Sequence, residues 1–197
     1  MKQLVFLLEE ESMKALLDVL LPQILPPEIE FLCIPHEGKQ DLEKSIPRKL
    51  RAWQTPDTTF VIVRDKDGAD CIEIKSRLVS LCQQAGRSDS LVRIACHELE
   101  SWFLGDLAAV EKAFNIKLAG QQKNRKYKEP DKLSNASEEL EKLVKGYRKV
   151  SGAKKIAAHM TIQQNYSHSF NCFISGISNL IKQQTDTKEI IEQLTLY

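Results

Sequence analysis

Apolar runs and segments with helical spacing alternate along the first half of the chain. Four runs have the length and the β-branched content of buried strands. They are residues 3–8, 29–34, 59–64 and 91–95. Between them, apolar residues recur every three or four positions, which predicts helices. These segments are residues 12–24, 41–53 and 69–84. The alternation predicts an α/β fold with a mainly parallel sheet of about four strands and helices on both faces.

Two residues indicate where the first predicted helix begins and where the second one bends. Ser12 stands where the first helix should begin and is a candidate N-cap, because its hydroxyl can accept a hydrogen bond from a free backbone N–H. Pro47 lies inside the second helix, where a proline can bend the chain. We therefore expect the first helix to begin at Ser12 and the second to carry a kink.

Beyond Glu98 only helical patterns occur, interrupted by one polar stretch. Apolar helices are predicted over residues 99–103 and 107–114, and further helices after the polar stretch. The latter are residues 138–148, 153–160, 170–183 and 187–196. The predicted layout is an α/β body over residues 1–116, a mobile basic polar loop over 117–137, and a helical C-terminal part over 138–197 that packs on the body. Trp102, Phe103 and Phe114 are predicted to be core residues.

Composition and charge narrow the class of protein. Hydrophobic residues make up 42% and charged residues 28% of the 197 positions, so a packed core is expected. The net charge of +1 gives no overall attraction to nucleic acid, and a polyanion would need a local basic patch. The five cysteines form no CxxC pair and are odd in number, which indicates reduced, mostly buried thiols in a cytoplasmic protein. No apolar run reaches the roughly 18 residues of a membrane span, and the N-terminus lacks the pattern of a secretory signal.

Carboxylates follow two of the predicted strands directly. The run over residues 59–64 ends in Asp65 and Asp67, and the first strand ends in Glu9. In an open α/β sheet, ligands bind at the carboxyl edge of the strands. If these two strands are neighbours, the acidic side chains meet there and repel one another unless a cation or protons occupy the cluster. Carboxylate oxygens suit Mg²⁺ or Mn²⁺, so Glu9, Asp65 and Asp67 are the expected ligands of one ion.

These acidic residues also fit other structures, or parts of them. The segment from Asp65 to Gly68 is also a good turn sequence, and acidic residues after the first strand favour the first turn of a helix, Glu11 being the one we expect to be simply solvated. An EF-hand loop fails, because its sixth position is Asp70 and its twelfth is Ser76. A receiver domain would need a later strand-end lysine that we do not find, and haloacid-dehalogenase-type phosphatases carry DxD after the first strand.

Two more glutamates lie just past the fourth strand. Glu98 and Glu100 are candidate ligands of a second ion in a two-metal arrangement. Because residues two apart do not share a helix face, Glu98 is favoured as the catalytic one. His97 is expected first to be a hydrogen-bonded structural residue, with a role as acid or base as the alternative.

Basic residues are candidates for phosphate or nucleic-acid contacts. Lys39 does not belong to a P-loop, because the upstream glycine and the following Ser or Thr are missing. It can contact a phosphate or stand as a solvated lysine at a helix start. Arg93 lies within a strand, where a buried ion pair is the first expectation and a phosphate contact the alternative.

A basic stretch occupies the predicted loop. Lys123, Arg125, Lys126 and Lys128 surround Tyr127, whose ring is available for stacking on a base. The cations can guide a nucleic-acid strand, or the segment can be a simple solvated loop.

Taken together, these motifs resemble the Toprim domain of topoisomerases, primases and overcoming-lysogenization-type nucleases, which places Glu after its first strand and DxD after its third. The resemblance is closer to a Toprim-like family catalogued as a domain of unknown function. The segments that carry it are LEEESM at 8–13, GKQDL at 38–42, RDKD at 64–67, RIACHELESW at 93–102 and NYSHSF at 165–170. One departure is Glu10, where many Toprim proteins have glycine, and its loss removes a site of close backbone approach to a phosphate.

The resemblance implies a Rossmann-like Toprim fold and a Mg²⁺- or Mn²⁺-dependent phosphodiester hydrolase acting on nucleic acid, with DNA the preferred substrate. It implies that Glu9 is a general base if it is not a ligand. Members often lie beside an ABC-type or AAA-type ATPase in bacterial phage-defence and abortive-infection loci, which makes such an ATPase the expected partner. The alternative is a non-catalytic binding or regulatory subunit of an ATPase complex. The chain has no Walker motif of its own, and a homodimer is left open.

Overall fold

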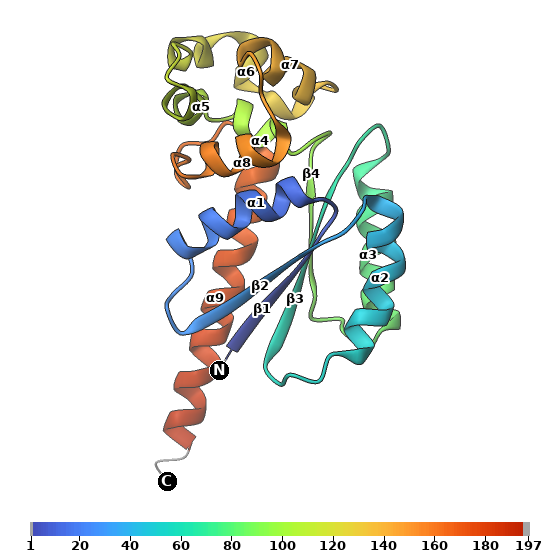
Figure 1. Cartoon of the computed structure of the whole chain (residues 1–197). Coiled ribbons are helices and arrows are strands. Elements are labelled where there is room, and N and C mark those ends of the chain that lie inside the picture. Colours follow the sequence, from blue (N-terminus) through green and yellow to red (C-terminus); the bar gives the residue numbers. More distant parts are fainter. Residues whose placement is uncertain (1, 195–197) are drawn as a thin grey trace.

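Four parallel strands form one sheet in the order β2-β1-β3-β4 (Figure 1). The computed structural model describes the backbone of residues 2–194 and the side chains of residues 2–183. The strands are β1 (Lys2–Leu8), β2 (Ile29–Pro35), β3 (Thr58–Asp65) and β4 (Leu91–Ala95). The predicted α/β class, the parallel sheet and all four strands are confirmed.

The order of the strands decides where a site can form. β1 pairs with β2 on one side and with β3 on the other, and Leu8 lies opposite Val63 in the register. From β1 the chain turns to β2, whereas from β3 it turns to β4, so connections leave these two neighbours in opposite directions. Such a switch point opens a crevice at the carboxyl edge, which is where ligands bind in open α/β sheets.

Helices cover both faces of the sheet because the side chains of each strand alternate between them. The helices α2 (Lys39–Ala52) and α3 (Cys71–Gln84) pack on the face that carries Val5 and Leu7. The helices α1 (Glu11–Leu20) and α9 (His168–Leu194) lie on the opposite face, with Leu4, Phe6 and Leu8 (Figure 1).

The remaining helices form a cap above the carboxyl edge of the sheet (Figure 1). They are α4 (Glu100–Leu104), α5 (Leu107–Phe114), α6 (Arg125–Lys128), α7 (Ala136–Leu143) and α8 (Lys149–Ala157). Short 3₁₀ turns complete the chain: η1 (Leu21–Gln23), η2 (Ala119–Lys123) and η3 (Pro130–Lys132). Cap side chains share one apolar core with β1 and α1, and Trp102 and Phe103 are buried in it as predicted. Phe114 is only partly buried against it.

Several local predictions were wrong. The N-cap of α1 is Glu10 rather than Ser12, whose hydroxyl instead donates to the Glu10 carboxylate. The expected loop over residues 117–137 contains the ordered turns η2, α6 and η3, because Tyr127 is buried and pins them to α7. A single helix, α9, replaces the two helices predicted over residues 170–183 and 187–196. The last residues of the second predicted helix lie outside the described residues.

The cysteines are free thiols, as predicted, but they are less buried than expected. Only Cys33 and Cys82 are fully buried, and Cys172 is exposed. Of the helices that the structure describes, none combines the length and the apolar character needed to cross a membrane.

Candidate active site

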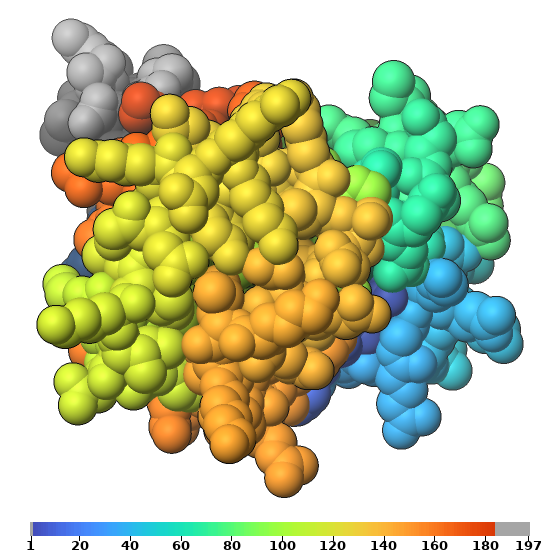
Figure 2. All heavy atoms as spheres, turned by 90° about the horizontal axis from the view of Figure 1, so that it is seen from above, coloured from blue at the N-terminus to red at the C-terminus, as the bar shows by residue number. Residues whose placement is uncertain are grey.

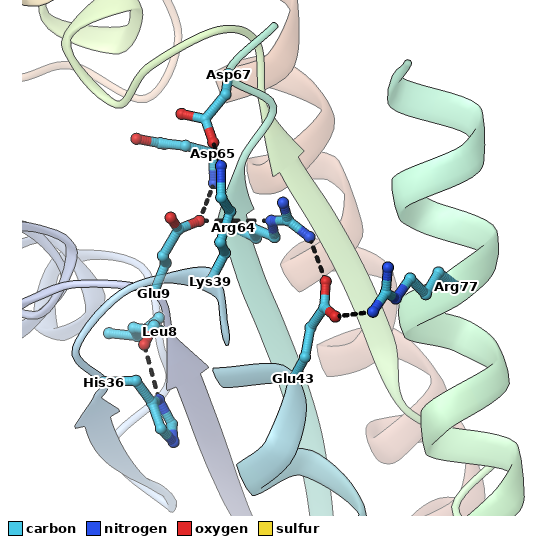
Figure 3. Close-up of polar contacts among 9 residues, drawn as sticks. All are labelled: Leu8, Glu9, His36, Lys39, Glu43, Arg64, Asp65, Asp67 and Arg77. Carbon is cyan, nitrogen blue, oxygen red and sulfur yellow. Dashed lines mark hydrogen bonds and ion pairs between the residues drawn. The ribbon is translucent and has the colours of Figure 1, made fainter. Parts of the chain in front are cut away.

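Glu9 and Asp65 meet at the switch point between β1 and β3. The backbone N–H of Glu9 donates to the carbonyl of Val63 over 3.2 Å, which continues the β1–β3 ladder past the end of β1. The Glu9 carboxylate then accepts a hydrogen bond from the backbone N–H of Asp65, 3.1 Å from N to Oε2 (Figure 3). The prediction that these two strands are neighbours is confirmed, and their acidic ends lie side by side.

Arg64 orients the Glu9 carboxylate from below the edge. Its side chain is buried, with Nε 3.6 Å from Glu9 Oε2 and a terminal nitrogen 2.6 Å from Glu43 Oε1. Arg77 on α3 holds the other oxygen of Glu43 at 2.6 Å (Figure 3). Sequence reasoning did not identify this chain of ion pairs, although a lone arginine ending an apolar strand was a signal, since a buried charge needs a partner.

The carboxyl group of Asp65 is the most strongly perturbed acid of the edge. Only 7% of the residue is exposed, and Oδ1 has no hydrogen-bond partner. Burial raises the pKa of Asp65 well above its usual value, and the carboxylates of Glu10, Glu9 and Glu100 raise it further. The pKa of Glu9 is also raised, chiefly by burial. These groups therefore resist being charged together, which is the situation expected of a cation-binding cluster.

The cap contributes further charged side chains to the acidic cluster. Glu100, the first residue of α4, is fully buried; its Oε1 accepts from the Tyr147 hydroxyl at 3.3 Å and its Oε2 has no partner. Lys149, the first residue of α8, places Nζ 3.9 Å from Oε2 of Glu10. Although burial lowers the pKa of Lys149, the carboxylates of Glu100, Glu10 and Asp65 raise it above its usual value. Sequence reasoning missed Lys149, because it lies far along the chain in an ordinary basic helix.

Asp67 does not join the buried carboxylates. It is half-exposed, and its Oδ2 lies 2.9 Å from Nζ of Lys39, the first residue of α2 (Figure 3). Its backbone has φ of 53° and is held by His97, which accepts the Asp67 N–H at its carbonyl over 2.8 Å. His97 Nδ1 lies 3.0 Å from the Asp67 carbonyl oxygen, so the imidazole has the structural role that we expected first.

Glu98 lies beside the cluster and is engaged by another element. Its Oε2 accepts the backbone N–H of Ser137 at 2.8 Å, at the start of α7. The structure thus brings Glu100, rather than Glu98, into direct electrostatic interaction with Asp65.

Apart from Lys39, the predicted basic contacts fall in two separate places. Arg93 does not form the buried ion pair that we expected first, because its Nε donates to the carbonyl of Cys172 in α9 at 2.9 Å. In the cap, Lys126 is paired with Glu139 at 2.5 Å, and Lys123 and Arg125 are exposed. The expectation that the neighbouring tyrosine is available for base stacking was wrong, since its ring is buried.

The donor chemistry of the cluster fits a hard divalent cation. Two buried carboxylate oxygens, one on Asp65 and one on Glu100, have no partner, and Glu9 and Glu10 face the same space. Within the part of the chain that the structure describes, however, no three Asp, Glu, His or Cys side chains are grouped closely enough to hold a metal ion as they stand. An ion could be held here only if these side chains moved closer together, which the relief of repulsion between carboxylates would favour.

Looking down on this edge, Figure 2 shows the cap (yellow and orange) beside the starts of α2 (light blue) and α3 (teal). The carboxylates lie between these two walls, which come from segments far apart in the sequence.

The buried carboxylates predict how stability depends on pH without metal. The pKa of Glu100 is raised, chiefly by burial, so its protonated form is favoured in the folded state. The stability from this group is fully present below the unfolded pKa of about 4.3 and is lost as pH rises through the folded pKa. We expect Glu100→Gln to raise the free energy of unfolding at pH 7 by about 1 kcal/mol and to leave it nearly unchanged at pH 4. Urea unfolding in EDTA at both pH values measures this, and an equal change at the two would contradict it.

Comparisons with known proteins add one finding. The model of a family described as Domain of unknown function (DUF4276) matches residues 8–178. No curated protein and no solved structure matches the chain. The match spans β2, β3 and β4, the helices from α1 through the cap and the first part of α9, and it includes only the last residue of β1.

Proposed function

The chain belongs to the DUF4276 family, and from the carboxyl edge of its sheet we propose that it is a Toprim-like, metal-dependent nuclease that hydrolyses phosphodiester bonds. One observation carries the proposal: the buried Asp65 carboxyl group, with an unpartnered oxygen, faces three other carboxylates at the switch point of the sheet. Such a cluster destabilises the fold, so its presence favours a functional role. Hard oxygen donors favour Mg²⁺ or Mn²⁺.

Each residue of the edge has a role in this proposal. Asp65 and Glu9 hold the ion, with Glu100 completing the donor set, and the bound ion supplies an activated water and stabilises charge on the phosphodiester. Arg64 keeps the Glu9 carboxylate in place through their ion pair. Where Glu9 is not a ligand, it serves as the general base that takes a proton from the attacking water.

Two lysines flank the carboxylates from opposite walls. Lys39 lies on the α2 side and Lys149 on the cap side, so each is placed to contact a phosphate oxygen held between the walls. The ion pair of Lys39 with Asp67 is half-exposed and therefore contributes little to stability. Its release costs correspondingly little, which frees Asp67 for the ion and Lys39 for the substrate.

The biological setting is part of the same proposal. We propose a DNA substrate and an ABC-type or AAA-type ATPase partner in bacterial phage defence, acting in the cytoplasm, with a homodimer as the arrangement still to be tested. The chain has no Walker motif, so any ATP hydrolysis has to come from the partner.

A non-catalytic regulatory subunit is the second candidate. It is favoured by the absence of a ready-made group of three metal ligands among the described side chains, and by the two lysines that already offset the acidic charge. The two candidates differ in whether the protein binds a divalent ion at Asp65.

Metal binding is expected to raise the thermal stability of the protein. An ion present at about a hundredfold its dissociation constant adds about 2.7 kcal/mol, which corresponds to roughly 5–10 °C for a chain of this size. We expect this increase in Tm with MnCl₂ relative to EDTA, and its loss in Asp65→Asn. Asp89→Asn is the matched control, because Asp89 is exposed near the amino edge of the sheet. An equal increase in wild type and Asp65→Asn would place the ion elsewhere.

A further inference from the structure

A cleft of about 460 Å³ runs along the free edge of β4, between α3 and α9. Its charged side chains are cationic: Lys75 comes from α3, Arg93 from β4 and, when protonated, His168 from α9. Amide side chains of Asn171 and Asn179 add hydrogen-bonding groups, and none of the described residues that line the cleft is an aspartate or a glutamate. The cleft is thus a concave surface of one charge sign, which attracts anions.

Arg93 is built into this cleft rather than lying loosely on it. Arg93 shares with Leu91 and Ala95 the face of β4 that packs against α9. Its guanidinium donates to the carbonyls of Cys172 and Val92, each at 2.9 Å. A guanidinium has five N–H donors, so three are left after these two bonds.

Gly176 of α9 makes room for the guanidinium. A Cβ at this position would lie 2.4 to 2.7 Å from three guanidinium atoms of Arg93. The guanidinium can lie this close to α9 because residue 176 is a glycine. This close packing holds the planar guanidinium at one place in the cleft.

The charge of Arg93 has no carboxylate partner among the described residues. Burial lowers the pKa of the guanidinium from its usual value, and an opposing effect comes from the neighbouring Cys172 thiol rather than from a carboxylate. A half-buried cation without a counter-charge is costly, and an anion in the cleft would offset that cost. The carbonyls of Cys172 and Val92 fix the orientation of the Arg93 guanidinium. A guanidinium held in one orientation presents its N–H donors in the geometry that matches the oxygens of a phosphate.

One end of the cleft lies near the carboxyl edge of the sheet. Cys96 and Cys71 line its upper end. Cys96 directly follows β4, whose last residue pairs with Asp65, and Cys71 begins α3 just after the acidic loop. The cleft and the acidic cluster thus lie at the ends of neighbouring strands, β4 and β3.

We propose that this cleft binds the phosphate groups of a nucleic-acid strand, with Arg93 as the principal contact and Lys75 as the second. The identification of the strand as nucleic acid rests on the proposed nuclease function, whereas the recognition of phosphate rests on the cleft alone. Free nucleotides carry the same phosphate chemistry, and the experiment separates the two sources.

Binding of a fluorescein-labelled single-stranded dT12 oligonucleotide in EDTA tests the proposal by fluorescence anisotropy. Arg93→Gln and Lys75→Gln are each expected to weaken binding roughly tenfold at moderate salt. Each is also expected to reduce the slope of log K against log salt concentration by about 0.7. Lys44→Gln is the matched control, because Lys44 is exposed on α2 away from the cleft, and it should bind as wild type does.

Gly176→Ala gives a test that changes no charge. The added methyl group should displace the guanidinium, the flexible end of a side chain, and alanine favours the helix. We expect dT12 binding to weaken by about as much as in Arg93→Gln while urea unfolding shows an intact fold. Unchanged dT12 binding in both Arg93→Gln and Gly176→Ala would overturn the proposal.

Competition distinguishes the source of the phosphate. Inorganic phosphate and AMP should displace dT12 only at millimolar concentrations, because each makes one of the several contacts of a strand. AMP that binds through Arg93 while dT12 does not bind would overturn the nucleic-acid assignment. The measurement uses no metal and no cleavage, so failure of the nuclease assay leaves the phosphate result standing, and failure here leaves the nuclease proposal standing.

Discussion

Asp65→Asn is expected to lower the rate of Mg²⁺- or Mn²⁺-dependent cleavage of single-stranded or plasmid DNA at least about a thousandfold. The substitution keeps the shape of the side chain but removes the negative charge that would hold the ion in the proposed site. Glu9→Gln should cause a similar loss, because both its ligand role and its role as a base need a carboxylate. Cleavage is measured with purified protein, alone and with an ATPase partner encoded nearby.

The same substitution should have the opposite effect on stability. Because burial and neighbouring carboxylates oppose the charged form of Asp65, its neutral replacement should raise the free energy of unfolding of the metal-free protein at pH 7. Loss of activity together with gained stability cannot come from unfolding. Asp89→Asn should change neither quantity, and full cleavage activity in both Asp65→Asn and Glu9→Gln would reject the nuclease.

Trp102→Ala is expected to cost about 3–5 kcal/mol of stability. The indole is 1% exposed, and its ring centroid lies 5.4 Å from that of Phe170 and 5.2 Å from that of Phe173. Its Nε1 donates to the Ser169 hydroxyl at 2.9 Å, so α4 of the cap is anchored on α9. Alanine leaves a cavity at this junction and removes one hydrogen bond to the Ser169 hydroxyl, which keeps the bond that it accepts from the Cys96 backbone N–H. Urea unfolding at pH 7 measures the loss.

Two variants show whether this junction has a special role. Trp102→Phe keeps an aromatic ring and loses the hydrogen bond, so it should cost about 1–2 kcal/mol. Trp53→Ala removes the other tryptophan, which is only partly buried against Phe60, and should also cost less. A loss in Trp102→Ala no larger than that in Trp53→Ala would show that the cap is held elsewhere.

The sheet and its acidic edge could be predicted because their signals are local. Apolar β-branched runs define strands, and a carboxylate that directly follows a strand must lie at its carboxyl end. This reasoning placed Glu9 and Asp65 correctly at the edge. It could not separate the buried Asp65 from the half-exposed Asp67, because the difference depends on the fold: the Asp67 backbone is left-handed and its carboxylate pairs with Lys39, although it still acts on Glu9.

The sequence by itself determined the fold class, the four strands and the candidate acidic residues at two of their ends. Only the tertiary structure decided which side chains surround these residues. Arg64 pairs with Glu9, Glu100 and Lys149 come from the cap, and Arg93 contacts α9. The physical reason is that burial, pairing and pKa depend on which distant segments pack together. A periodic pattern reports which face of an element is buried, but not what covers it.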